Sequence, residues 1–270
     1  MLEKRIATAV VLLTCFAAVL FLAPNMAAAA VFAGVAAAAA WEWSALTRSG
    51  ERARLAFVAV VLASCFVAWI WRDVLFYVLW SISAGFWLIL APPWLFKRPR
   101  ANLFVGWIVL LPTWAALVEL HARSPWLLLA VAGVVWVADI SAYFVGRAIG
   151  RRRLAPGISP GKTWEGVSGA VLGVLVYGIA IDWLPVGVSG LIIDAIGADD
   201  NTGRALLAIA LLLLTVMSII GDLFESLVKR QAGVKDSGRL LPGHGGLLDR
   251  IDSLCAVLPL SALLLYWIGR

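Results

Sequence analysis

Apolar residues recur in long, nearly uninterrupted stretches along the chain, and short polar segments separate them. An apolar stretch of about 17 to 25 residues is long enough to cross the hydrocarbon layer of a membrane as a helix. The pattern therefore predicts an all-α, polytopic integral membrane protein. About nine transmembrane helices are expected, over residues 6–22, 27–43, 55–71, 74–91, 103–118, 126–144, 167–184, 204–221 and 252–268.

Composition and charge support this class and favour one orientation. Hydrophobic residues make up 63% of the 270 residues and charged residues 14%, which is more apolar surface than a soluble domain of this length hides. The segments expected inside hold 18 of the 22 Lys and Arg residues, an asymmetry that predicts N-inside, C-outside. The formal net charge of +6 is therefore ascribed to topology and to anionic ligands, and no nucleic-acid partner is expected.

The two halves of the chain differ in polar content. Residues 1–125 carry few polar groups at membrane depth and are expected to be N-terminal scaffold helices. Residues 126–270 are expected to form the catalytic region, with an active site on the cytoplasmic face. Residues 185–203 are predicted to be a re-entrant or surface segment without chemistry. The first thirty residues resemble a secretory signal with a cleavage site, although a retained first helix is the favoured interpretation.

The most polar part of the chain is residues 222–252, between the last two predicted spans. Ionisable groups at a membrane edge usually mark a functional site. If the helix before this run continues into it, one face carries two carboxylates, a hydroxyl and an ammonium. These groups are Asp222, Glu225, Ser226 and Lys229. Such carboxylates suit magnesium, which binds one or two of them together with phosphates and waters.

The end of this run offers a second pair of carboxylates. Asp249 and Asp252 open the last predicted helix, where the alternative is an ordinary N-cap or an interaction with the helix dipole. An N-cap alone would not require the turn that precedes Asp249. In that turn, two glycine amides can point into a pocket and a histidine can donate to a phosphate. That turn contains His244, Gly245 and Gly246.

Two clusters earlier in the chain carry further candidates. Asp139 lies near the cytoplasmic end of the sixth span, and the alternative to a role in the site is a structural ion pair with Arg147 or with a neighbouring helix. Ser159 and Lys162 belong to a Gly-Pro turn before the seventh span. The N-terminal amides of that span favour an anion, but an ordinary helix-entry turn fits the pattern nearly as well.

Together these segments resemble the signature of the phosphatidate cytidylyltransferases, or CDP-diacylglycerol synthases. The resemblance rests on SLVKR at 226–230, KDSG at 235–238 and PGHGGLLDRID at 242–252, preceded by DISAYFVGR at 139–147 and ISPGKTWEG at 158–166. It is specific over about residues 136–255. One departure is Gly157, where many members carry Lys. A phosphate contact is then either missing or supplied by Arg151–Arg153.

The resemblance implies that CTP and phosphatidate react to give CDP-diacylglycerol and pyrophosphate, for phospholipid biosynthesis at the bacterial inner membrane. The catalytic residues it implies are Asp222, Asp249, Lys229 and Lys162. A magnesium ion is implied on Asp222 and Asp249, with outer support, or a second cation, at Glu225, Asp252 and Asp139. The residues expected to bind the CTP or lipid phosphates are Ser159, Lys162, Ser226, Lys229, Arg230, Lys235, Arg239, His244, Gly245 and Gly246. A homodimer is left open.

Other activities fit part of the pattern. A CTP-dependent polyprenol or dolichol kinase binds its nucleotide through a similar motif, but it transfers the terminal phosphoryl group. An anion transporter also places acids and cations near the membrane, yet it should show repeated halves or broken helices with polar residues at mid-membrane. A CDP-alcohol phosphotransferase is disfavoured, since its Asp-Gly…Ala-Arg run is not found in the sequence.

Overall fold

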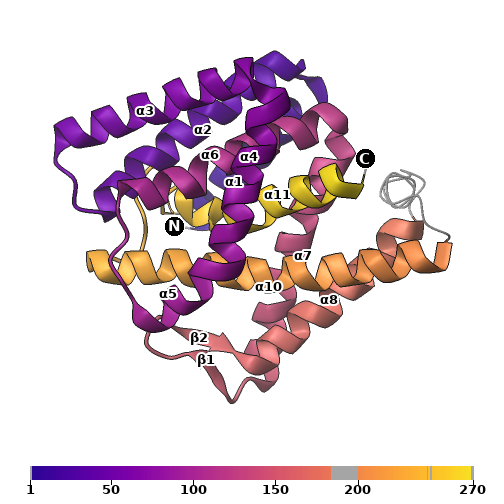
Figure 1. Cartoon of the computed structure of the whole chain (residues 1–270). Helices are drawn as coiled ribbons and strands as arrows, with labels where there is room; N and C mark the ends of the chain where they lie inside the picture. The colour runs from indigo at the N-terminus through magenta and orange to yellow at the C-terminus, as the bar shows by residue number, and fades with distance from the viewer. Residues whose placement is uncertain (1, 184–199, 242, 244, 269–270) are drawn as a thin grey trace.

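The structure, a computed structural model, describes residues 2–183, 200–241, 243 and 245–268. Helices account for nearly all of these residues (Figure 1). The first part of the chain forms α1 (Leu2–Leu22), α2 (Asn25–Leu46), α3 (Glu51–Ile70), α4 (Arg72–Gly85), the π-helical turn η1 (Phe86–Leu90), α5 (Ala91–Lys97) and α6 (Leu103–Arg123). The second part forms α7 (Pro125–Ile149), β1 (Arg153–Ala155), β2 (Ser159–Thr163), α8 (Trp164–Trp183), α10 (Asp200–Ala232) and α11 (Leu248–Ile268).

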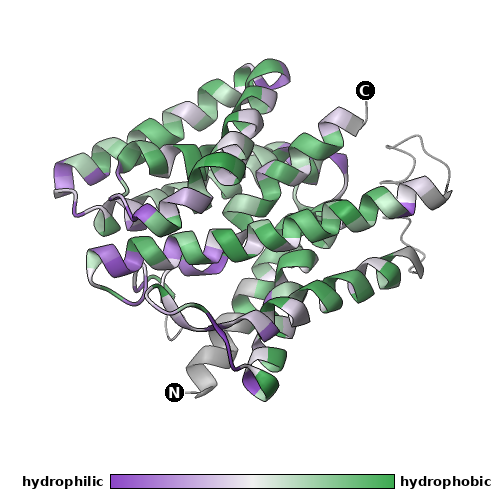
Figure 2. Ribbon diagram, turned by 60° about the horizontal axis from the view of Figure 1, so that its bottom comes forward, coloured by the Kyte–Doolittle hydropathy of each residue, from purple (hydrophilic) through white to green (hydrophobic). Residues whose placement is uncertain are grey.

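The hydrophobic pattern located the helices correctly. Each of the nine predicted apolar stretches coincides with a helix, the fourth with the continuous segment α4–η1–α5. Among the described residues, seven helices are long and apolar enough to cross a membrane. Their middle parts are hydrophobic, and hydrophilic positions gather near helix ends and on the connections (Figure 2). The chain is thus a polytopic, mainly α-helical membrane protein, while nine crossings and an inner N-terminus stay predictions. Of the predicted re-entrant or surface segment, residues 185–199 lie outside the described residues.

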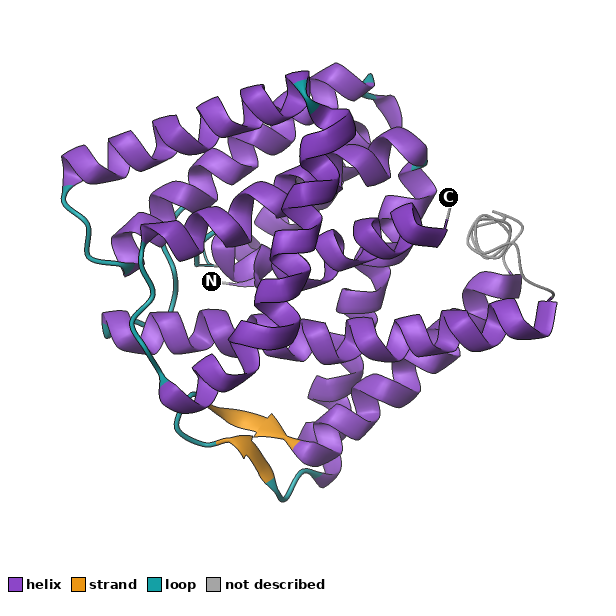
Figure 3. Ribbon diagram, viewed as in Figure 1, coloured by secondary structure: helices purple, strands orange, loops and turns teal. Residues whose placement is uncertain are grey.

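A short β-hairpin interrupts the helices, and the sequence did not predict it (Figure 3). Strands β1 and β2 pair in antiparallel fashion, with Arg153 opposite Thr163 and Ala155 opposite Ser159. Residues 159–163 form a strand and not the tight turn expected there, while their binding of phosphate stays a prediction. Pro160 and Gly161 disfavour a helix there, and the extended backbone leaves α8 to begin only at residue 164.

Helix α11 joins the two halves of the fold. It packs against α4 and α6 from the first part of the chain and against α7 and α10 from the second. Helices α7 and α8 pack closely along most of their length because glycines allow their backbones to approach. A Cβ atom on Gly166 would lie only 2.9 Å from the carbonyl oxygen of Ala142. The part of α7 that follows Asp139 is therefore held tightly against the start of α8.

An aromatic cage fixes the end of α10. The ring of Phe224 is almost fully buried, and the rings of Phe86 and Trp87 from η1 each lie 5.4 Å from it, centroid to centroid. Trp94 on α5 and Trp43 on α2 complete the cage at 5.8 and 6.4 Å. Because Phe224 lies between Asp222 and Glu225 in the helix, the cage also fixes the neighbouring carboxylates.

Candidate active site

Helix α10 runs on past the end of the predicted span at residue 221 and carries the predicted polar face. It continues to Ala232, so the predicted stripe of carboxylates, hydroxyl and ammonium is confirmed as helical. The hydroxyl of Ser226 donates to Oδ1 of Asp222 at 3.2 Å. The ammonium of Lys229 lies 2.7 Å from Oε2 of Glu225, four residues earlier. The stripe is thus an internally connected set of polar side chains at the end of an apolar helix.

The two carboxylate pairs, Asp222 with Glu225 and Asp249 with Asp252, meet where α10 crosses α11. A Cβ atom on Gly221 would lie 2.9 Å from the carbonyl oxygen of Asp252 and 3.2 Å from the Cα of Ser253, so only glycine permits this approach. Asp222 follows Gly221 directly, and its charge acts on Asp252. Two carboxylates that are thirty residues apart in the chain therefore face one site.

Lys162 and Asp139 bring two further segments to the same place. The ammonium of Lys162, on β2, forms an ion pair with Oδ2 of Asp222. Asp139 is exposed on α7, within electrostatic range of both Asp222 and Lys162. The alternative of an Asp139–Arg147 ion pair is not observed in the described part of the chain, since the guanidinium of Arg147 donates instead to the hydroxyl of Tyr143 at 2.9 Å.

Asp249 is held by a lysine and by backbone amides. The ammonium of Lys229 lies 2.7 Å from its Oδ1, while the amides of Gly246 and Ser237 donate to its Oδ2 at 2.8 and 3.0 Å. Burial of this carboxyl acts to raise its pKa, but Lys229 and the two amides outweigh that effect and hold the pKa below its usual value. The ionised form of Asp249 is therefore favoured. Lys229 also contacts Glu225 and so joins α10 to α11.

The N-cap interpretation of Asp249 does not describe this geometry. Asp249 is the second residue of α11, and the amides it accepts belong to the loop before the helix. Gly246 donates its amide to Asp249, so it is engaged inside the protein and not directed at a pocket. Gly245 has a φ of +82° and no room for a side chain beside Asp249, which explains the glycine at this turn.

The other predicted phosphate ligands are spread around this centre. Arg230 donates from Nε to the carbonyl oxygen of Ile158 at 3.4 Å, which links α10 to the hairpin. Ser159 lies at the start of β2, half-buried. Lys235 and Arg239 are exposed on the loop that follows α10. His244 lies outside the described residues.

Two residues near the site could not be identified from the sequence. The guanidinium of Arg98 lies over Gly157, where a Cβ atom would lie 2.6 Å from its Nη2. Arg98 therefore places a cation beside Gly157, the position at which the sequence departs from the family pattern. The backbone amides of Arg151 and Arg152 bind Glu165, and the exposed side chains of both residues stay candidates for the phosphate contact. No local pattern connects Arg98 with the hairpin. The second residue, Glu42, accepts hydrogen bonds from the loop before α11, and an acid inside the apolar second span was the available signal.

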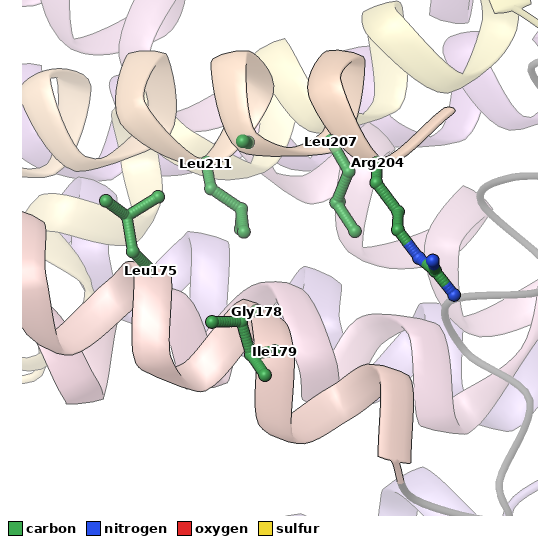
Figure 4. A pocket seen from close by; sticks show the side chains of 7 residues that line it. Leu175, Gly178, Ile179, Arg204, Leu207 and Leu211 are labelled. Atoms are coloured by element: carbon green, nitrogen blue, oxygen red, sulfur yellow. The ribbon is translucent and has the colours of Figure 1, made fainter. Parts of the chain in front are cut away.

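A large apolar cavity lies elsewhere. Its volume is about 730 Å³, and Figure 4 shows Leu175 and Ile179 on α8 facing Leu207 and Leu211 on α10. Leu211, the lining residue of α10 nearest to Asp222, precedes it by 11 residues, or about 16 Å along a helix. The cavity is too distant to belong to the carboxylate cluster.

Comparison with known proteins assigns the chain to a family. A sequence model of the cytidylyltransferase family matches residues 3–268, which is nearly the whole chain. This chain belongs to the cytidylyltransferase family. The resemblance inferred from the motifs is thereby confirmed. Because the match includes the N-terminal helices, the kinship extends well beyond the polar motifs.

Several similar cytidylyltransferases are known from bacteria. The phosphatidate cytidylyltransferase of Pseudomonas aeruginosa is 38% identical over 288 residues, which cover 100% of this chain and 98% of the relative. That of Haemophilus influenzae is 33% identical over 295 residues and covers 96% of each chain. That of Brucella abortus is 48% identical over 136 residues, half of this chain.

The donor set of this cytidylyltransferase suits a hard divalent cation. Five carboxylates interact electrostatically around two lysines, so the cluster formally carries three negative charges in excess. The carboxylates are Asp139, Asp222, Glu225, Asp249 and Asp252. No group of three or more converges as a ready-made metal site among the described residues. Magnesium fits nevertheless, because it commonly takes only one or two protein carboxylates and completes its shell with phosphates and waters.

Proposed function

We propose that this cytidylyltransferase transfers the cytidylyl group of CTP to phosphatidate and so forms CDP-diacylglycerol and pyrophosphate for phospholipid synthesis. The observation that carries the proposal is the carboxylate and lysine cluster where α10 and α11 cross, at the end of membrane helices. A lipid phosphate at headgroup level and a soluble nucleotide both reach such a position. The whole-length match to bacterial phosphatidate cytidylyltransferases supports this substrate pair over a kinase or a transporter.

The reaction joins two anions, and the chain supplies charge to offset their repulsion. An oxygen of the lipid phosphate attacks the α-phosphorus of CTP, the bond to the β-phosphate oxygen breaks, and pyrophosphate leaves with that electron pair. The attacking oxygen is already ionised, so no dedicated general base is needed. Lys162 and Lys229 neutralise phosphate charge where it grows during transfer, and catalysis of this kind relies on positioning and electrostatics.

Magnesium is the proposed cofactor, with Asp222 and Asp249 as its ligands. When bound, it would offset phosphate charge and help pyrophosphate to leave. Lys162 is the ion-pair partner of Asp222, and Lys229 that of Asp249, so each proposed ligand has a phosphate-binding ammonium beside it. Glu225, Asp252 and Asp139 would orient the ligands or hold a second cation.

We place the enzyme in the bacterial inner membrane with this cluster facing the cytoplasm, where CTP is available. The excess of Lys and Arg on the predicted inner segments supports this orientation. Phosphatidate would enter sideways from the inner leaflet, since its acyl chains need not leave the bilayer. The candidates for holding phosphate oxygens are Ser159, Ser226, Arg230, Lys235, Arg239, His244 and Gly245, whereas the amide of Gly246 is already bound by Asp249.

Isotope labelling tests the proposal. The purified protein is incubated with phosphatidate, magnesium and CTP carrying phosphorus label at either the α or the γ position. Label from the α position should enter the lipid, and γ label should leave as pyrophosphate. Lipid that acquires γ label would convert the assignment to a kinase, and transfer of neither label would refute an enzyme acting on these substrates.

A further inference from the structure

Glu42 is a buried acid in an otherwise apolar helix. Glu42 lies near the end of α2 and is only 4% exposed. Its Oε1 accepts the amide of Leu247 at 3.1 Å, and its Oε2 accepts the amide of Leu248 and the hydroxyl of Ser237, both at 2.9 Å. Three donors from a segment about two hundred residues further along the chain thus converge on one carboxylate.

The environment of Glu42 explains why a charge is retained there. A buried carboxylate is costly unless it is paired or hydrogen-bonded. In the part of the chain that the structure describes, no Lys or Arg forms an ion pair with it, so its compensation comes from the three donors. Leu248 is the first residue of α11, and the positive end of that helix dipole adds to the stabilisation.

The same loop donates hydrogen bonds to both Glu42 and Asp249, and the donors to the two carboxylates alternate along it. Ser237 gives its amide to Asp249 and its hydroxyl to Glu42. Gly246 gives its amide to Asp249, and the next residue, Leu247, gives its amide to Glu42. A shift of the loop that broke the bonds to one carboxylate would therefore displace the donors of the other.

The packing around Glu42 leaves little freedom for another arrangement. A Cβ atom on Gly246 would lie 2.7 Å from the amide nitrogen of Gly238 and even closer to the Glu42 carboxylate. A Cβ atom on Gly238 would lie 2.8 Å from Cδ of Glu42. The loop therefore fits against α2 only with glycine at both positions.

We propose that Glu42 is a positioning residue: it anchors Ser237, Leu247 and Leu248 to α2 and thereby holds Asp249 in its working geometry. The inference rests on the proposed function only in so far as Asp249 takes part in the transfer. It also assigns a role in the site to α2, which belongs to the half of the chain that the sequence marked as scaffold.

The test compares Glu42→Gln with Glu51→Gln, a matched change on the exposed first turn of α3. In Glu42→Gln one carboxylate oxygen becomes an NH₂ group, so a donor faces a donor. Hydrogen exchange of the full-length protein in lipid nanodiscs should show the amides of Leu247 and Leu248 exchanging about 10-fold faster or more. The transfer rate should fall roughly 10- to 100-fold, because a small misplacement of a reactive group has effects of that size.

A shift in metal dependence separates positioning from a general loss of folded enzyme. Glu42→Gln should require several-fold more magnesium for half-maximal activity, whereas partial unfolding lowers the rate at an unchanged requirement. Unchanged exchange at Leu247 and Leu248 would overturn the inference. If Glu42→Gln does not fold, Ser237→Ala must still speed that exchange, since it removes one donor and keeps the carboxylate. If the wild type transfers no label while exchange responds as expected, the proposed function fails and the anchoring of the loop stands.

Discussion

Replacing Lys229 with methionine tests whether one ammonium holds α10 and α11 together. Its side chain is only 12% exposed and lies 2.7 Å from both Glu225 and Asp249, whose side chains are 4% and 8% exposed. Methionine keeps the length and the packing of the side chain but removes the charge. Two nearly buried carboxylates would then face each other without their shared cation.

Removing one partner of a buried ion pair typically lowers the free energy of unfolding by about 3–5 kcal/mol. Here Asp249 keeps the amides of Ser237 and Gly246, so most of the loss should arise at Glu225, which accepts no hydrogen bond from any other described residue. Taking ~2–4 °C per kcal/mol for a chain of this size, the melting temperature should fall by about 6–20 °C. Thermal unfolding in detergent, followed by circular dichroism, measures the shift.

A second substitution separates charge from packing. Adding Glu225→Gln to Lys229→Met removes the uncompensated carboxylate, so the double variant should be more stable than Lys229→Met alone. Lys235→Met, on the exposed loop, should leave the melting temperature within about 1 °C of the wild type, since surface substitutions change little. A Lys229→Met protein as stable as the wild type would refute the reasoning about this buried network.

Substitutions at Gly246, Lys162 and Phe224 give three further predictions. Gly246→Ala should lower the transfer rate more than 10-fold, since its Cβ has no room beside Ser237, whereas Gly161→Ala, with open space around its Cβ, should change the rate less than about 2-fold. Lys162→Met should raise the KM for CTP and lower kcat together, with Lys162→Arg restoring part of the activity, as steady-state kinetics can show. Phe224→Ala should lower the free energy of unfolding by about 3–5 kcal/mol, because it empties the aromatic cage.

Features with a local signature could be predicted from the sequence. The helices follow from the nine apolar stretches, and the stripe from Asp222 to Lys229 follows from helical spacing once the helix extends beyond Gly221. The pairing of Lys162 with Asp222 and of Lys229 with Asp249 joins residues that the motifs had already singled out. The motifs therefore identified the residues of the site but not which of them contact one another.

Features that depend on long-range packing could not be predicted. The bond from Leu248 to Glu42 spans 206 positions, and nothing in the neighbourhood of either residue specifies the other. The position of Arg98 over Gly157 likewise arises only when α5 packs beside the hairpin. The hairpin itself is short, and its Pro and Gly residues signal a turn more strongly than strands.

Replacing Asp222 with asparagine tests whether CTP and phosphatidate react at the carboxylates where α10 and α11 cross. The substitution keeps the size of the side chain and removes the charge that pairs with Lys162. The measurement is the initial rate at which α-phosphorus label from CTP enters the lipid, with Glu51→Gln as the control and melting temperature as the check of folding. We predict a folded Asp222→Asn protein with less than about 1% of the wild-type rate, a loss typical of an interaction that stabilises charge during the reaction. A folded variant that transfers label at the wild-type rate would contradict the account.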